Sequence, residues 1–359
     1  MGPRQQAALV GTSDGAICLV QDAAMPQVRH DGVLVKVKAI AVNPVDSKMV
    51  GSYVTAGAVL GCDFAGVVVE SGADSKEASV VNDVHIGDRV CSFVMGMNPR
   101  RPSVGAFAEY TSAQKHLLLK MPPAMSYEEG AGLGTSFLTA GMALFHSLRL
   151  DGHPLDPRSV PNCPVLVYGG SSATGTAAIQ LLRLAGFDPV TTCSPHNFVM
   201  VRSCGAAAVF DYHGPDCAEQ IKKHTKSGLR YALDCISTVA SMKLCYQAMG
   251  RLGGKYTSLE PYAESIAQDR KLIKADWIMT PQLLGDEVAW PEPHYRPADP
   301  AVERFGAVWV ETLNKLLEKG LIRSHPVEVR QGGLDRVMQG VQDARSQSVS
   351  GRKLVYRLG

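Results

Sequence analysis

A short turn of small residues, placed between an apolar strand and a helix, constrains this chain most. Residues 165–168 (VLVY) predict a buried strand, and residues 177–185 predict a helix that Gly186 ends. Between them lies the segment GGSSATG, residues 169–175. A strand that enters a helix through such a turn directs backbone N–H groups and the positive end of the helix dipole outward, which favours phosphate. The segment therefore predicts a dinucleotide-binding turn, with an ordinary strand-to-helix turn as the alternative.

Strands and helices alternate after this turn. Further strands are predicted at residues 189–193, 207–210, 231–236 and 254–259, with helical segments between them. Alternation of this kind implies right-handed crossovers and a parallel sheet. The sequence thus predicts a doubly wound α/β domain in this part of the chain.

The first third of the chain has a different pattern. Short strands are predicted at residues 33–42, 64–70 and 87–93, separated by Gly, Pro, Asn and Asp, which is typical of a partly open barrel or a sandwich. Ser126 and Glu129 then predict the start of a helix that extends to about Leu148. A proline-rich stretch at 151–164 is predicted to be a linker or a surface loop, a helix is predicted at 301–319, and a final strand at 353–357 closes the first domain. We predict a β-rich domain at 1–160, a doubly wound domain at 161–319, and a return to the first domain at 320–359.

Composition excludes several classes of protein. The formal net charge is only +2, which argues against a nucleic-acid-binding protein. No run of 18 apolar residues is present, so no membrane span is expected, and residues 1–6 do not resemble a secretory signal. The nine cysteines include no C-x-x-C pair, which favours reduced, packed thiols in a cytoplasmic protein.

The residues after the second strand of the doubly wound domain bear on which dinucleotide is bound. NAD-specific sites place an acidic residue about 20 positions after the glycine turn. Here the strand ends in Ser194, His196 and Asn197 with no Asp or Glu, and these residues are able to bond a 2′-phosphate. The sequence therefore favours NADP, with an ordinary turn and helix cap as the alternative. Tyr212, after the third strand, is expected to pack against the adenosine, and Ser172 to add a hydroxyl contact to a phosphate.

These motifs, taken with others along the chain, identify a family. The sequence resembles zinc-independent medium-chain dehydrogenases/reductases in the runs NPVD (43–46), GCDFAG (61–66), GDRV (87–90), GAFAEY (105–110) and VLVYG (165–169). Within that family it is similar to fungal trans-acting polyketide enoyl reductases of the lovastatin-pathway type, through TCSPHNF (192–198), LRYALDCI (229–236) and RQGG (330–333). The resemblance implies a GroES-like catalytic domain, a Rossmann domain, and hydride transfer from NADPH to an enoyl thioester on an acyl carrier protein.

The resemblance also implies a set of site residues. The cofactor-binding residues are expected to be Val45, Asp46, Ser47, Lys48, Gly170, Ser171, Ser172, Ala173, Thr174, Ser194, Pro195, His196, Asn197, Tyr212, Leu259, Glu260, Val349 and Ser350. The substrate-binding residues are expected to be Thr135, Phe137, Thr139, Leu283, Leu284 and Gly285.

Three residues of the predicted β-rich domain, Lys48, Tyr53 and Thr139, are candidates for catalysis. Lys48 is a candidate cation for the cofactor or the nascent enolate, against the alternative of a solvated loop lysine. Thr139 lies four residues after Thr135, hence on the same helical face, and either hydroxyl is able to reach the substrate; small-residue helix packing is the alternative. Tyr53 is a candidate proton donor by resemblance to mitochondrial-type enoyl reductases, against ordinary loop packing.

A catalytic metal is not expected. Val45 stands where the zinc-dependent relatives have a cysteine, and Gly61-Cys62-Asp63 replaces their G-H-E motif. Zinc needs at least three convergent ligands, whereas neighbours on a strand point to opposite faces. Reduction of a conjugated C=C bond requires orientation of the alkene and donors to the enolate rather than a Lewis acid.

Prolines 281, 291, 293, 297 and 300 lie where quinone reductases join edge strands, so a monomer is predicted. The alternatives to an enoyl reductase are an NADPH quinone or enone reductase and a non-enzymatic NADPH-binding sensor.

Overall fold

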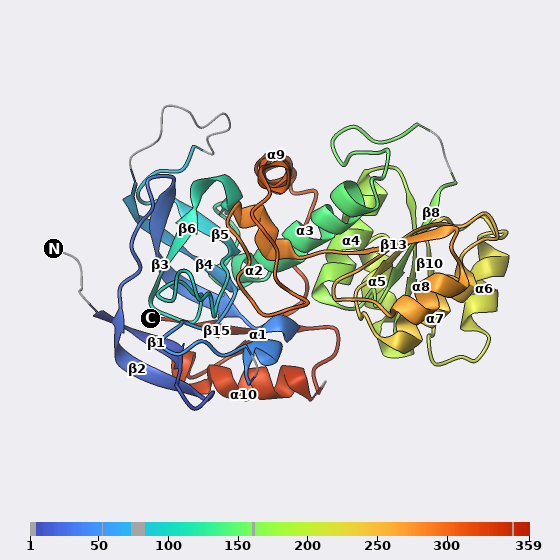
Figure 1. The fold of residues 1–359 in the computed structure, drawn as a ribbon. Coiled ribbons are helices and arrows are strands. Elements are labelled where there is room, and N and C mark those ends of the chain that lie inside the picture. Colours follow the sequence, from blue (N-terminus) through green and yellow to red (C-terminus); the bar gives the residue numbers. More distant parts are fainter. Residues whose placement is uncertain (1–4, 52, 73–82, 160–161, 347) are drawn as a thin grey trace. The chain divides into compact units, whose positions relative to one another are not determined.

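The computed structural model describes residues 5–51, 53–72, 83–159, 162–346 and 348–359 (Figure 1). Its contacts divide the chain into two compact units. Unit 1 consists of Met1–Thr135 and Pro281–Gly359, and unit 2 of Ser136–Thr280. Among the described residues, the helices are all too short or too polar to cross a membrane.

These units differ in extent from the domains predicted at 1–160, 161–319 and 320–359. Residues 136–160 lie in unit 2, where Lys255 Nζ donates to the Leu148 carbonyl at 2.9 Å. Residues 281–319 lie in unit 1, where Asn314 Oδ1 accepts from Lys120 N at 2.8 Å. The prolines of 154–164 mark a loop in the sequence, but they do not show which sheet the segments on either side pack against.

Unit 1 is built on a seven-stranded sheet in the order β14-β15-β3-β4-β5-β7, with β6 paired to β3. The bounds are β3 (Gly32–Ala41), β4 (Asp63–Ser71), β5 (Arg89–Phe93), β6 (Tyr110–Gln114), β7 (Leu119–Lys120), β14 (Val327–Arg330) and β15 (Lys353–Arg357). A separate pair joins β1 (Gln5–Gly11) to β2 (Ile17–Ala24). As predicted, the final strand returns to this unit, because β15 pairs antiparallel with β3.

Unit 2 is a six-stranded parallel sheet in the order β10-β9-β8-β11-β12-β13. The bounds are β8 (Pro164–Tyr168), β9 (Asp188–Thr192), β10 (Ala208–Phe210), β11 (Tyr231–Asp234), β12 (Gly254–Ser258) and β13 (Ile273–Trp277). The first strand, β8, lies in the middle, and the chain adds β9 and β10 on one side of it and β11 to β13 on the other. This is the doubly wound order, in which ligands bind outside the carboxyl ends of the strands where the order reverses. The predicted combination of a β-rich part and a doubly wound parallel sheet is confirmed.

Helices connect these strands. In unit 1 they are α1 (Pro44–Met49), η1 (Lys115–Leu117), α2 (Tyr127–Ala131), α9 (Pro300–Glu318) and α10 (Gly333–Arg345). In unit 2 they are η2 (Met142–Ser147), α4 (Ala173–Leu184), η3 (Pro195–Asn197), α5 (Phe198–Ser203), α6 (Cys217–His224), α7 (Val239–Ala248) and α8 (Glu264–Asp269). Two more, α3 (Gly134–Gly141) and η4 (Thr280–Leu284), contain the points where the chain passes from one unit to the other.

The single helix predicted from Ser126 to Leu148 is wrong in its length. Its start is confirmed, because Ser126 Oγ accepts from Glu129 N at 3.2 Å and Glu129 Oε2 accepts from Ser126 N at 2.9 Å. The helix α2 then ends at Ala131, α3 begins at Gly134, and the last turn, η2, is a π-helix. Glycines at 130, 132 and 134 lower the helix propensity at the break, and a Cβ at Gly134 would lie 2.4 Å from the Ser92 carbonyl oxygen.

Candidate active site

The turn at residues 169–175 has the geometry of a phosphate-binding turn. It joins the end of β8 to the first residues of α4, at the point where the strand order reverses. Gly169 has a φ of 80°, a conformation that favours glycine. A Cβ at Gly175 would lie 2.3 Å from the Gly169 carbonyl oxygen, so the close approach of α4 to the strand needs glycine there too. The first N–H groups of α4 therefore face the carboxyl edge of the sheet, where an anion is stabilised.

Ser172 holds this turn together from within. Its hydroxyl accepts from Gly175 N at 3.0 Å, as the N-cap of α4, and donates to the Gly169 carbonyl at 2.8 Å. The hydroxyl proton is thus engaged inside the turn. We expected Ser172 to offer its hydroxyl to a phosphate, but in this arrangement the backbone N–H groups are the donors that remain for a ligand.

The loops after β9 and β10 meet at the same edge. The parallel pairing aligns Tyr168 with Thr192 and Thr192 with Phe210, so residues just beyond them are neighbours. Ser194 Oγ lies 3.4 Å from the Tyr212 hydroxyl, and the Tyr212 ring lies 5.9 Å from that of Tyr168. The structure therefore brings the predicted Ser194 and Tyr212 together. His196 and Asn197 follow in η3, with Asn197 Nδ2 3.2 Å from His196 Nε2.

The next strands contribute a buried carboxylate that sequence reasoning missed. Asp234, the last residue of β11, accepts from Ser241 Oγ at 2.6 Å and from the Tyr256 hydroxyl at 2.8 Å. It also accepts from Ser237 N at 2.8 Å, while Ser237 Oγ accepts from Leu259 N at 2.9 Å. Burial raises the pKa of Asp234 above its usual value, against the effect of these donors. The network shapes the loop that carries the predicted contacts Leu259 and Glu260.

Helix α1 presents the predicted residues of unit 1. Its N-cap, Asn43, forms a capping box with Asp46, whose Oδ2 accepts from Asn43 N at 2.6 Å. Asp46 is completely buried, so its side chain points away from any ligand that binds at the surface of α1. Burial raises the pKa of Asp46 to about 7, against the lowering effect of the Asn43 N–H. Val45, Ser47 and Lys48 lie on the same short helix.

A buried ion pair holds the N-cap of α1 in place. Lys353 Nζ lies 2.6 Å from Asp63 Oδ2, and the two side chains are 3% and 0% exposed. Both ions bond Asn43: Lys353 Nζ donates to Asn43 Oδ1 at 2.7 Å, and Asn43 Nδ2 donates to Asp63 Oδ2 at 2.9 Å. This network joins β4, β15 and α1.

The second carboxylate oxygen of Asp63 accepts two hydrogen bonds from Thr135. Asp63 Oδ1 accepts from Thr135 N and from Thr135 Oγ1, each at 2.7 Å. The hydroxyl proton of Thr135 is therefore used by Asp63. Thr135 was predicted to contact the substrate, and in this arrangement its oxygen remains able only to accept a further hydrogen bond.

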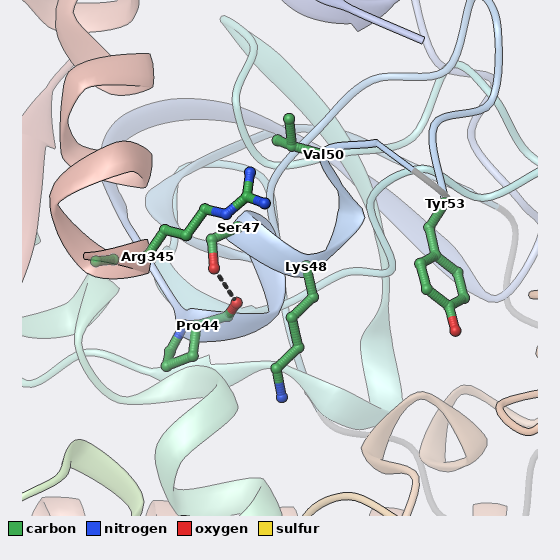
Figure 2. A pocket seen from close by; sticks show the side chains of 7 residues that line it. Pro44, Ser47, Lys48, Val50, Tyr53 and Arg345 are labelled. Carbon is green, nitrogen blue, oxygen red and sulfur yellow. Dashed lines mark hydrogen bonds between the residues drawn. The ribbon is translucent and has the colours of Figure 1, made fainter. Parts of the chain in front are cut away.

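A cavity of about 440 Å³ opens beside α1 (Figure 2). It is lined by Pro44, Ser47, Lys48, Val50, Tyr53, Ala344 and Arg345. The predicted catalytic candidates Lys48 and Tyr53 are thus both at this cavity, and Figure 2 shows their side chains extending to the same side of α1. Arg345, at the end of α10, was not foreseen, since nothing in its sequence context distinguishes it from other helical arginines.

Tyr53 is held by two aromatic neighbours. Its hydroxyl lies 2.9 Å from His294 Nδ1, and the rings of Trp290 and His294 meet it edge-on at 6.0 and 5.5 Å. Trp290 is buried and donates Nε1–H to the Met97 carbonyl at 3.1 Å. The phenol is therefore held in position by an imidazole nitrogen at its oxygen and by two rings at its sides.

The remaining predicted residues lie in several places. Phe137 and Thr139 are buried in α3, and Thr139 Oγ1 lies 2.8 Å from Thr280 Oγ1. Leu283 is completely buried in unit 1, and the Leu284 carbonyl accepts from Gln114 Nε2 at 2.7 Å, just before Gly285 with a φ of 76°. Val349 and Ser350 belong to the segment between α10 and β15. The substrate-binding and cofactor-binding roles of these residues remain predictions.

Within the described ranges, we find no group of three His, Cys, Asp or Glu side chains arranged to hold a metal ion. Cys62 is buried beside Asp46, and burial together with the two neighbouring carboxylates holds the pKa of its thiol well above the usual value. A thiol that keeps its proton is a poor metal ligand.

Comparison with known proteins bears on the whole chain. Residues 29–123 match the family model of the alcohol dehydrogenase GroES-like domain, and residues 173–259 match that of the zinc-binding dehydrogenases. Trans-enoyl reductase eqxC of Fusarium heterosporum is 60% identical over all of both chains, and trans-enoyl reductase fsa3 of Fusarium sp. (strain FN080326) is 59% identical over the same share. The chain belongs to the trans-enoyl reductases of the medium-chain dehydrogenase/reductase family. The resemblance that the sequence motifs indicated, including the assignment to enoyl reductases, is confirmed.

Solved structures of the family share the fold over the full length. An alcohol dehydrogenase superfamily protein from Novosphingobium aromaticivorans has a TM-score of 0.77 at 20% identity, covering 99% of each chain. Identity at this level shows the fold alone. The GroES-like and Rossmann architecture predicted from the sequence is thereby confirmed.

Proposed function

We propose that this chain is an NADPH-dependent enoyl reductase acting in trans on an α,β-unsaturated polyketide thioester carried by an acyl carrier protein. One observation carries the proposal: a chain 60% identical to a trans-enoyl reductase over its whole length has its small-residue turn at the switch point of a doubly wound sheet. Family membership supports a nicotinamide cofactor. That the substrate is bound to a carrier protein, and that NADPH is preferred to NADH, are proposed in addition.

The residues at the carboxyl edge of unit 2 fit a phosphorylated dinucleotide. The first N–H groups of α4 and the close approach at Gly175 suit a pyrophosphate. The segment after β9 has no carboxylate to repel a 2′-phosphate, and it places Ser194 beside Tyr212. We therefore propose that Ser194 and His196 bond the 2′-phosphate, with Asn197 nearby, and that Tyr212 packs against the adenosine.

When bound, NADPH would supply a hydride for the β-carbon of the substrate. Negative charge on the thioester carbonyl oxygen would need a cation or donor beside it, and we propose that the Lys48 ammonium stabilises it. Tyr53 holds a proton at its phenolic oxygen that is delivered to the α-carbon, and the hydrogen bond to His294 keeps that oxygen in place. The buried cap of α1 positions Lys48 and excludes water behind it.

The proposal extends to assembly and location. We propose a monomer, because prolines 281, 291, 293, 297 and 300 follow the edge strand β13 and remove backbone donors from the segment that follows. We propose a cytoplasmic enzyme, since its thiols are unpaired and include several that are buried. No nucleic acid or membrane partner is part of the proposal.

The test measures NADPH oxidation with short enoyl-pantetheine thioesters, beside NADH and beside quinones. We expect turnover with the thioesters and a preference for NADPH. Lys48→Ala should lower kcat by about 10²-fold if the ammonium stabilises the enolate. Lys36→Ala, an exposed lysine on β3, is the matched control and should leave kcat unchanged.

Two results would contradict the proposal. Activity on quinones with none on thioesters would make the chain a quinone reductase, and cofactor binding without hydride transfer to any enone would make it a sensor. A Lys48→Ala variant with unchanged kinetics would remove Lys48 from the mechanism but leave the assigned reaction intact.

A further inference from the structure

Three loops of unit 2, at residues 226–230, 250–253 and 269–272, lie side by side at the amino edge of its sheet. Parallel pairing aligns Tyr231 with Lys255 and Gly254 with Ile273, so the residues that precede β11, β12 and β13 are neighbours. Hydrogen bonds join the loops directly: Lys255 N donates to the Arg230 carbonyl at 2.8 Å, and Gly254 N donates to the Leu272 carbonyl at 3.1 Å. The three loops thus form one continuous surface.

Two leucines project from this surface into solvent. Leu252 is 80% exposed and Leu272 is 67% exposed, among the most exposed large apolar side chains of the described residues. The loops that carry them approach closely, because a Cβ on Gly253, the residue after Leu252, would lie 2.6 Å from the Leu272 Cβ. A single exposed leucine needs no explanation, but two on adjoining loops make a small apolar centre.

Basic residues surround these leucines. Lys226, Arg230, Arg251 and Lys271 are all exposed on the same three loops. In the segments 226–230, 250–255 and 269–274, the sequence has one carboxylate, Asp269. The whole chain is nearly neutral, with a net charge of +2, so this is a local concentration of positive charge. We call the set of Lys226, Arg230, Arg251, Leu252, Lys271 and Leu272 the basic–leucine patch.

The patch is rigidly supported from beneath. Arg270 donates through one nitrogen to the Tyr246 carbonyl and to the Met249 carbonyl at 3.1 Å, and through another to the Gly250 carbonyl at 2.6 Å. Gly250 N in turn donates to the Leu229 carbonyl at 2.9 Å. Because the loops are already ordered, a partner that binds them loses little additional conformational entropy.

The patch lies at the opposite edge of the sheet from the predicted cofactor contacts. The turn at 169–175, Ser194 and Leu259 all follow the carboxyl ends of strands, whereas the patch precedes the amino ends. A protein bound at the patch therefore leaves the cofactor edge of unit 2 uncovered. This separation suits a docking surface rather than a substrate subsite.

We propose that the basic–leucine patch docks an acidic surface with an apolar centre on the partner polyketide synthase. The proposal rests on the function proposed above, because an enzyme that acts in trans must find its substrate on another protein. Tethering to the same synthase raises the effective concentration of the carrier-bound substrate. Complementary charge speeds the encounter, and the two leucines supply the apolar contact that a charged rim surrounds.

Other partners fit the patch less well. Membrane-surface helices bury a long apolar face, whereas this surface is made of three short loops with two leucines. Affinity for nucleic acid comes mainly from phosphate contacts with basic residues, and the two exposed leucines of the patch do not contribute to such contacts. An acidic protein surface is the partner class that uses both kinds of side chain.

The test compares two substrates of one enzyme. One is a but-2-enoyl chain loaded on the full holo-synthase that supplies the substrate, and the other is the same chain on free pantetheine. The variant Arg251→Glu/Lys271→Glu and the variant Leu252→Ser/Leu272→Ser should each raise KM for the synthase-bound chain about tenfold. Neither should change kcat/KM for the pantetheine thioester. Arg304→Glu/Lys319→Glu, two exposed residues of unit 1 with the same change of charge, is the matched control.

Salt gives an independent readout. Raising the salt concentration from about 0.05 M to about 0.5 M should increase KM for the synthase-bound chain in the native enzyme much more than in the Arg251→Glu/Lys271→Glu variant. Unchanged KM in both patch variants would overturn the docking proposal, as would an equal effect in the control variant. Patch-dependent binding to phosphatidylserine vesicles or to duplex DNA, with synthase kinetics unaffected, would also overturn it. Failure of the enoyl reductase assignment would appear separately, as loss of activity on both substrates in the native enzyme.

Discussion

The turn at residues 169–175 in unit 2 and helix α1 in unit 1 are both predicted to contact the cofactor, yet they are built differently. The turn is local: a glycine with positive φ, a serine cap and a close glycine contact lie within seven consecutive residues. Helix α1 depends on distant residues, since Asn43 is held by Asp63 and by Lys353, 310 positions away. One surface is fixed by backbone conformation, and the other by buried charge.

This difference predicts how much stability the protein loses when a side chain in each region is replaced. Removing the capping side chain from the turn should lower the free energy of unfolding only by the contribution of one helix cap, because the glycines still permit the backbone conformation. Removing one partner of a buried ion pair should lower the free energy of unfolding by more, because the remaining charge is then uncompensated in a medium of low polarity. Three substitutions test that contrast, in order of expected effect.

The largest effect is expected from Lys353→Met. Asp63 would then be a buried carboxylate without its cation, and the free energy of unfolding should fall by about 3–5 kcal/mol. Urea denaturation at neutral pH measures this change. The double variant Asp63→Asn/Lys353→Met removes both charges and should recover most of the loss. As a control, Arg183→Met breaks the exposed pair with Asp188 and should cost less than about 1 kcal/mol. A Lys353→Met protein as stable as the native one would contradict the contrast.

A smaller, pH-dependent effect is expected from Asp46→Asn. The folded pKa of Asp46, about 7, lies above its ordinary value of 3.8, so the folded carboxyl keeps its proton to higher pH than the unfolded one. Its contribution to stability is therefore complete at low pH and decreases as the pH rises from about 4 to about 7, by about 2–4 kcal/mol. The asparagine oxygen still caps α1 but does not titrate.

Denaturation of both proteins at about pH 5 and about pH 8 measures the difference. The native protein should lose stability relative to Asp46→Asn as the pH rises. His325 has the opposite sign, since burial lowers its pKa to about 4, but it is present in both proteins and cancels. Parallel pH profiles for the two proteins would show that Asp46 does not titrate as expected.

The smallest effect is expected from Ser172→Ala in the turn. Loss of the cap on Gly175 N should lower the free energy of unfolding by about 1 kcal/mol. Ser171→Ala, in the same turn but not at the cap, should change it by less than about 0.5 kcal/mol. Thermal or urea unfolding of both variants makes the comparison. A Ser172→Ala protein that unfolds as easily as Lys353→Met would remove the distinction between the two regions.

Much of the fold follows from local sequence patterns. The apolar runs predicted as strands before the turn and after it appear as β3, β4, β8 and β9, and the Ser126–Glu129 capping box forms as expected. Such features depend on residues a few positions apart. The helix predicted to reach Leu148 is instead broken at Gly132, because the close approach of Gly134 to Ser92 depends on a strand far away in the sequence.

The sequence predicted those site residues that stand in local motifs, but not those that distant segments contribute. The phosphate turn, Lys48 and Tyr53 stand in recognisable motifs, and the structure places the latter two at one cavity. Asp63 and Lys353 were each visible as a charged residue at the start of an apolar strand, but 290 positions separate them. His294, which bonds Tyr53, and Arg345, which lines the same cavity as Lys48, also come from segments far along the chain, and no local pattern marked them.

The amino-acid sequence by itself determined the alternation of strands and helices, the small-residue turn and the family to which the chain belongs, because each depends on neighbours along the chain. Tertiary structure alone decided that Lys353 would neutralise Asp63, that Asp46 would be buried, and that two exposed leucines would lie on adjoining loops among basic residues. Burial and Coulomb attraction depend on distance in space, and that distance is set only when the sheets have formed.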